Sequence, residues 1–154
     1  MSRDARESYL GRPVLVAVDR CIQICLSRAE ACTRAAEEAS YPALRDLLYE
    51  VGEESRHHAV ALQGIVKPFG RGYPSGTRAR HEYRPGPRSD RDVLAGCIDA
   101  ELAAMADFEL AFTWAPLSAM PMVVRALTLS AYSATLRTLS DLRRLSVPMP
   151  STQR

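Results

Sequence analysis

Apolar residues recur along much of the chain at alternating steps of four and three, the spacing of a helix with one buried side. The clearest run lies within residues 42–66 and consists of Leu44, Leu48, Val51, Ser55, His58, Leu62 and Ile65. A β-strand would alternate every two residues instead. The pattern therefore predicts a helix over about 42–66, with Pro42 in its first turn, where proline costs no hydrogen bond.

A second helix is predicted ahead of it, over about residues 13–39. This stretch is rich in Ala, Leu, Glu and Arg and has no Gly or Pro after Pro13, so nothing in it interrupts a helix. Ser40, Tyr41 and Pro42 mark the turn between the two helices. The side chains expected to face inward are Val14, Val18, Cys21, Cys25, Arg28, Cys32 and Ala35.

Two more helices are predicted in the second half, over about residues 89–114 and 121–147. Ser89, with Asp92 three positions later, has the spacing of a capping box. Pro148 is expected to stop the last helix, because proline cannot continue one. The expected inward sets are Leu94, Ile98, Glu101, Met105, Phe108 and Phe112 in the third helix, and Leu129, Tyr132, Leu136, Leu139 and Leu142 in the fourth.

Residues 67–88 separate the two pairs of helices and have no helical period, being rich in Gly, Pro, Arg, Tyr and Ser. A connection of this length at about 3.3 Å per residue could run along a bundle about 40 Å long. The sequence therefore predicts an all-α fold, a four-helix bundle of ferritin-like topology in which two helical hairpins are joined by one long crossover loop. A single domain over 1–154 is expected, since the chain is 47% hydrophobic and 25% charged.

Charge and cysteine content narrow the setting of the protein. A formal net charge of +2 calls for neither nucleic acid nor an anionic membrane as partner. The apolar run after Pro13 is broken by Asp19 and Arg20, too early for a signal peptide or a membrane span. We therefore expect a cytoplasmic protein whose four cysteines are reduced thiols.

The predicted helices resemble those of a known family. Residues 35–39, 42–45 and 55–63 resemble the first hairpin of an uncharacterised ferritin-like bundle family that is distantly similar to rubrerythrin. Residues 93–101 with Phe108 resemble its third helix, which carries Cys and Glu one turn apart, and residues 121–145 resemble its fourth. The resemblance implies a comparison with ferritin-like di-iron proteins, which place one Glu on each of two helices and a Glu-x-x-His pair on each of the other two.

Measured against that pattern, the ligand set is incomplete. Glu54 and His57 form one literal Glu-x-x-His match, although the apolar spacing points Ser55 and His58 inward instead. Glu101 lies on the inward side of the third helix. Between Pro121 and Ser140 the fourth helix contains no Asp, Glu or His, so it cannot supply its share of a di-iron centre.

Two interpretations of the inward polar residues remain open. In one, Cys25, His58, Glu101 and Cys97 form a mixed site for zinc or iron. In the other, which we favour, Glu101 forms a buried ion pair with Arg28 or His58 that fixes the register of the helices. Copper(I) bound by Cys21, Cys25 and Cys32 is less favoured, because three thiols in a helix are more often small core residues.

Neither a nucleophile paired with a base nor a phosphate-binding glycine loop is visible in the sequence. We therefore predict a non-enzymatic structural or interaction module, with a metal-binding bundle as the alternative. Apolar residues at the end of the third helix, such as Phe112 and Trp114, favour a homodimer. The crossover could contact an acidic protein partner through its arginines, Arg71, Arg78, Arg80, Arg84 and Arg88.

Overall fold

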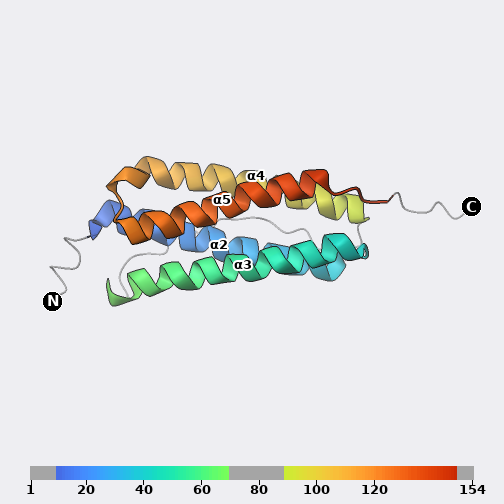
Figure 1. Cartoon of the computed structure of the whole chain (residues 1–154), viewed down its shortest axis with the longest axis horizontal. Coiled ribbons are helices and arrows are strands. Elements are labelled where there is room, and N and C mark those ends of the chain that lie inside the picture. Colours follow the sequence, from blue (N-terminus) through green and yellow to red (C-terminus); the bar gives the residue numbers. More distant parts are fainter. Residues whose placement is uncertain (1–9, 70–88, 149–154) are drawn as a thin grey trace, which may run out of the picture.

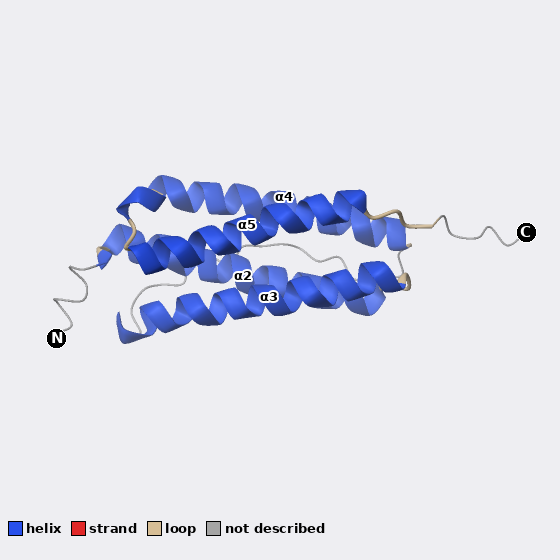
Figure 2. Cartoon of the chain, in the orientation of Figure 1, coloured by secondary structure: helices blue, strands red, loops and turns tan. Residues whose placement is uncertain are grey.

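The computed structural model describes residues 10–69 and 89–148, and within these ranges the protein is a bundle of four long helices (Figure 1). The helices are α2 (Arg12–Glu38), α3 (Pro42–Val66), α4 (Asp90–Trp114) and α5 (Met122–Arg144), with single 3-10 turns at Lys67–Phe69 and Leu117–Ala119. The described ranges contain no strand (Figure 2). None of their helices is both long enough and apolar enough to cross a membrane.

The four predicted helices are confirmed, and the one boundary that moves appreciably is the end of the last. It was predicted at about residue 147, but α5 ends at Arg144, and Leu145 is extended with φ −72° and ψ 120°. The extended chain carries Val147 back onto the core, where its side chain is buried with Leu142. Burial of Val147 therefore ends the helix before Pro148 would have to.

The helices form two antiparallel hairpins, α2 with α3 and α4 with α5, as predicted (Figure 1). The carboxylate of Asp90 accepts hydrogen bonds from the backbone N–H groups of Ser40 and Tyr41, at 2.8 and 2.9 Å. The start of α4 is thereby fixed beside the turn between α2 and α3, whereas α3 ends at the opposite end of the bundle. The connection between the hairpins joins opposite ends of the bundle, and its residues 70–88 lie outside the described ranges.

Going round the bundle, the order of the helices is α2, α3, α5, α4, and each helix is antiparallel to both neighbours.

Local side-chain chemistry explains where α4 begins and how closely α3 packs against α2. Ser89 caps α4, its hydroxyl accepting from the Asp92 N–H at 3.2 Å, as the capping-box spacing predicted. Gly52 lets α3 approach α2 closely, since a Cβ there would lie 3.2 Å from Thr33 Oγ1.

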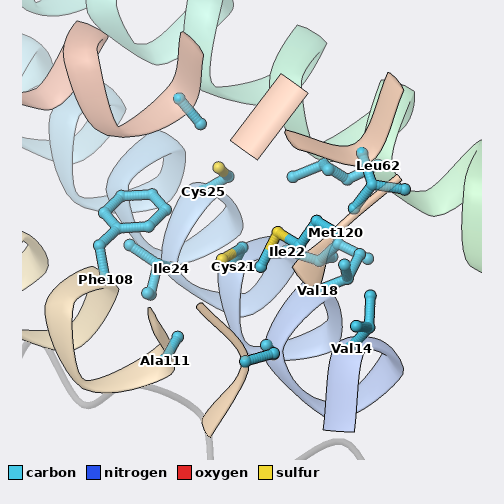
Figure 3. Packing of buried hydrophobic residues seen from close by; sticks show 14 of the residues in the cluster. Val14, Val18, Cys21, Ile22, Ile24, Cys25, Leu62, Phe108, Ala111 and Met120 are labelled. Carbon is cyan, nitrogen blue, oxygen red and sulfur yellow. The ribbon is translucent and has the colours of Figure 1, made fainter. Parts of the chain in front are cut away.

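The core consists of two apolar clusters at different levels along the bundle. One, drawn in Figure 3, brings Cys21 and Cys25 in the first half of α2 together with Leu62 of α3, Phe108 of α4 and Met120, which precedes α5. The other joins the second half of α2 to Leu44, Leu48, Val93 and Leu142. Buried polar residues lie between the clusters, among them Arg28, Ser55, Glu101 and Thr138, and this level is the candidate site described below.

The predicted inward residues of α2 are all buried, from Val14 to Ala35. The prediction for α5 is wrong for two of its leucines, because Leu129 and Leu136 are 44% and 40% exposed. The helix instead buries a face of small and hydroxyl-bearing residues, namely Val124, Thr128, Ala131, Ala134, Thr135 and Thr138, together with Leu139 and Leu142. Thr135 and Thr138 fit the interior because their hydroxyls donate to backbone oxygens one turn back.

Candidate functional site

Arg28 is the centre of the polar level. It lies on the buried side of α2, between Cys25 and Cys32, and only 3% of its surface is exposed. A charged side chain in such a position is costly unless it is paired and hydrogen-bonded. Its surroundings meet this requirement, because each of the other three helices contributes one buried polar residue to it.

The principal partner is Glu101 of α4. Arg28 Nε lies 3.0 Å from Glu101 Oε1, and Arg28 Nη2 lies 2.9 Å from Oε2, so guanidinium and carboxylate meet edge to edge. On its other sides Arg28 donates from Nη1 to Ser55 Oγ of α3 at 3.1 Å and from Nη2 to Thr138 Oγ1 of α5 at 3.3 Å. One side chain thus links all four helices at one level.

The charges at this level balance one another. Burial alone would lower the pKa of Arg28, but the charge and hydrogen bonds of Glu101 outweigh it, so the pKa is raised and the guanidinium stays charged. Thr138 is also satisfied, because it donates to the Ala134 carbonyl at 2.9 Å while accepting from Arg28. The layer is a closed hydrogen-bond network rather than an open binding site.

The cysteines next to Arg28 are protonated thiols, the form that binds metals poorly. Burial raises the pKa of the Cys25 thiol to about 11, even though the charge of Arg28 acts in the opposite direction. Burial raises the pKa of Cys32 as well, with Glu101 adding to the effect. Both thiols are therefore protonated near neutral pH and react slowly with electrophiles, and a metal ion would have to displace their protons to bind. Cys97 is half-buried on α4, and none of the four cysteines forms a disulfide.

The predicted Glu-x-x-His pair lies apart from this centre. Glu54 forms an ion pair with Arg137 of α5, and His57 is exposed. His58 is half-buried, with Nε2 3.3 Å from Ser130 Oγ, and its Nδ1 is buried without a hydrogen-bond partner among the described residues. Burial lowers the pKa of His58, opposed by the charge of Glu54.

The contact between Ser130 and His58 lacks, among the described residues, the third group of a catalytic triad. An imidazole that acts as base toward a serine is held by a third group on its other nitrogen. Here Nδ1 meets no such group in the described part of the chain.

The donor set does not fit the di-iron centre that the family resemblance implies. The Glu101 carboxylate is engaged by Arg28, and the buried residues of α5 include neither a carboxylate nor an imidazole. Within residues 10–69 and 89–148, no three His, Cys, Asp or Glu residues are grouped so that they could hold a metal ion. Metal binding by Glu54, His57, His58, Glu101, Cys25 and Cys97 therefore stays a prediction.

Sequence reasoning located part of this centre. It placed Arg28, Ser55 and Glu101 on inward faces and named a pair between Arg28 and Glu101 as one of two interpretations of the polar residues. It missed Thr138, which was not among the inward residues predicted for α5. The available signal was the run of small and hydroxyl-bearing residues at helical spacing, Thr128, Ala131, Thr135 and Thr138.

Comparisons of the chain with protein-family models, with curated proteins and with solved structures return no match. The fold and the centre define the class of the protein as an all-α four-helix bundle of two hairpins. A buried ion pair lies between the two apolar clusters of its core.

Proposed function

We propose that the protein is a non-catalytic bundle of ferritin-like topology that serves as a structural or interaction module. The observation that supports this most is the position of the Arg28 guanidinium, at the level where a ferritin-like protein would hold metal, bonded to residues from the three other helices. A permanent cation there takes the place of a metal ion in balancing the carboxylate.

The order of the helices supports the ferritin-like part of the proposal. Two antiparallel hairpins whose connection joins opposite ends of the bundle are the variant with one long crossover. The same order could arise in unrelated bundles, so it supports a topology and not an activity.

The alternative is a zinc- or iron-binding bundle that uses Cys, His and Glu. It would require Glu101 to leave Arg28, and a buried guanidinium without its partner is strongly unfavourable. The feature on which this alternative rests is the unpartnered Nδ1 of His58, since neutral imidazole is a common metal ligand.

Elemental analysis of protein purified without chelators, followed by dialysis against Zn²⁺ and against Fe²⁺, separates the two. The proposal expects far less than one tightly held metal per chain, both in the wild type and in Glu101→Gln. About one zinc or iron per chain in the wild type, lost in Glu101→Gln but kept in the exposed control Glu50→Gln, would establish the alternative instead.

A further inference from the structure

The outward sides of α4 and α5 carry several large apolar side chains that are exposed to solvent in the single chain. Buried residues occur on one side of α4, yet Leu102 and Leu110 on its other sides are 40% and 47% exposed. On α5 the outward positions recur at steps of four and three, the period of a helix-packing seam. These positions are Met122, Ala126, Leu129, Ser133 and Leu136.

The two sets of apolar residues face the same way. The Tyr132 hydroxyl of α5 donates to Glu109 of α4 at 2.9 Å, which fixes the edges along which the two helices meet. Helical spacing then places Leu102 and Ala106 on the outward side of α4 next to that edge, and Leu129 and Leu136 on the corresponding side of α5. We call the surface formed by Leu102, Ala106, Leu110, Met122, Leu129 and Leu136 the α4–α5 face.

The charges of the two helices are opposite. Among the exposed residues of α4, three are acidic, Asp92, Asp99 and Glu109, and one is basic, Arg91. Among the exposed residues of α5, four are basic, Arg125, Arg137, Arg143 and Arg144, and none is acidic. A surface with one acidic and one basic half is complementary to a copy of itself turned by 180°, since each half then meets its opposite.

We propose that the α4–α5 face binds a second copy of this chain, with a two-fold axis parallel to the helices. That axis lays α4 of one copy over α5 of the other and keeps the same ends together. Asp99, exposed in the first half of α4, then comes near Arg143 of the partner copy, exposed at the end of α5. A two-fold axis across the helices would instead lay acidic α4 on acidic α4.

The size of the face fits a stable dimer. Helices of 25 and 23 residues are about 35 Å long, and two of them about 9 Å apart present a strip about 20 Å wide. The strip covers about 700 Å² per copy, close to the roughly 800 Å² per partner of a standard interface. This inference goes beyond the proposed function. The two are tested by different measurements, metal content for the proposed function and self-association for the dimer, so either can be contradicted without the other.

Sedimentation of the full chain over roughly 1 to 100 µM tests the proposal. We expect a dimer of twice 17.0 kDa. Its dissociation constant should rise at least ten-fold in Leu136→Asp. Val60→Asp is the matched control, because Val60 is 65% exposed on the outer side of α3, and it should leave association unchanged. A monomer at every concentration would overturn the proposal, as would a dimer that tolerates Leu136→Asp.

Charge reversal and cross-linking test the direction of the axis. Asp99→Arg and Arg143→Asp should each weaken the dimer, and the double variant should recover it. The Arg28 and Tyr132 contacts place Ala106 level with Ser133, and both are exposed. Mixing Ala106→Cys chains with Ser133→Cys chains should therefore give disulfide-linked pairs of unlike chains. Efficient linkage within Ala106→Cys alone would place α4 on α4 and contradict this arrangement.

Discussion

Arg28 and Glu101 meet 2.9 Å apart, each almost fully buried, at the level that separates the two apolar clusters of the core. The pair joins α2 to α4, the two helices that start the two hairpins. Because the guanidinium also reaches Ser55 and Thr138, a shift of any helix along its axis would break at least one hydrogen bond. The polar layer thus defines how the hairpins dock, where apolar packing alone would tolerate more than one register.

Replacing one partner of this pair should lower the free energy of unfolding far more than replacing both. Glu101→Ala leaves a buried guanidinium unbalanced, and we expect a loss of about 3–5 kcal/mol in the free energy of unfolding. Replacing both partners, with Arg28→Met and Glu101→Leu together, should recover most of that loss, since apolar side chains of similar size need no partner. Urea unfolding followed by circular dichroism measures both values.

The double variant distinguishes a contribution of the pair to helix register from a contribution to the free energy of unfolding. If it matches the wild type in stability but loses cooperativity or associates differently, the layer contributes register rather than free energy. A double variant no more stable than Glu101→Ala would contradict the argument, because the unbalanced charge would then not be the cause of the loss.

Much of this arrangement follows from the sequence, and the exception is informative. Most inward positions of α3 were predictable because large apolar residues mark them, for example Leu44, Leu48 and Leu62. On α5 the leucines mark two sides, and the side chosen by the interior is the one with small residues and threonines. Size and hydroxyl pairing decide there, since a residue facing Arg28 must accept a hydrogen bond and leave room for the guanidinium.

Two glycines of α3 should respond in opposite ways to the same substitution. At Gly64 an added Cβ meets nothing within 4 Å, so Gly64→Ala should raise the free energy of unfolding by about 0.5–1 kcal/mol through helix propensity alone. At Gly52 the Cβ would lie 3.2 Å from Thr33 Oγ1. That hydroxyl is held by hydrogen bonds to the Ala29 carbonyl and from Arg56, both 2.8 Å, so it cannot easily move away.

We therefore expect Gly52→Ala to be no more stable than the wild type, and less stable than Gly64→Ala, by thermal unfolding. Equal stabilisation by the two substitutions would mean that α2 and α3 are not packed as closely as the structure has them.

His58 should make stability depend on pH. Burial lowers its pKa in the folded state below the usual 6.5, so the folded protein favours the neutral imidazole. The favourable contribution is complete above pH 6.5 and is lost as the pH falls below that value toward the folded pKa. Glu54 opposes the shift, while Arg28, Arg137 and His57 add to it.

Because His58 is only half-buried, we expect a loss of under about 1 kcal/mol between pH 7.5 and pH 5. Chemical denaturation at a series of pH values should show this loss in the wild type and in His57→Gln, and a smaller one in His58→Gln. The same slope in all three proteins would assign the pH dependence to other groups.

Asp90 should be the residue on which the docking of the two hairpin ends most depends. Its carboxylate accepts from the backbone N–H groups of Ser40 and Tyr41, so it closes the turn between α2 and α3 from the first turn of α4. Asp90→Ala removes both hydrogen bonds and should cost about 1–3 kcal/mol in the free energy of unfolding, whereas Asp90→Asn keeps one acceptor and should cost less. Asp92→Ala serves as the control for lost charge in the same helical turn, since in the described ranges the Asp92 side chain accepts from its own cap residue Ser89 and makes no bond to Ser40 or Tyr41. Amide hydrogen exchange at Ser40 and Tyr41 should accelerate in Asp90→Ala and stay slow in Asp92→Ala, and equal acceleration in the two variants would show that helix capping, not the bridge between hairpins, protects this turn.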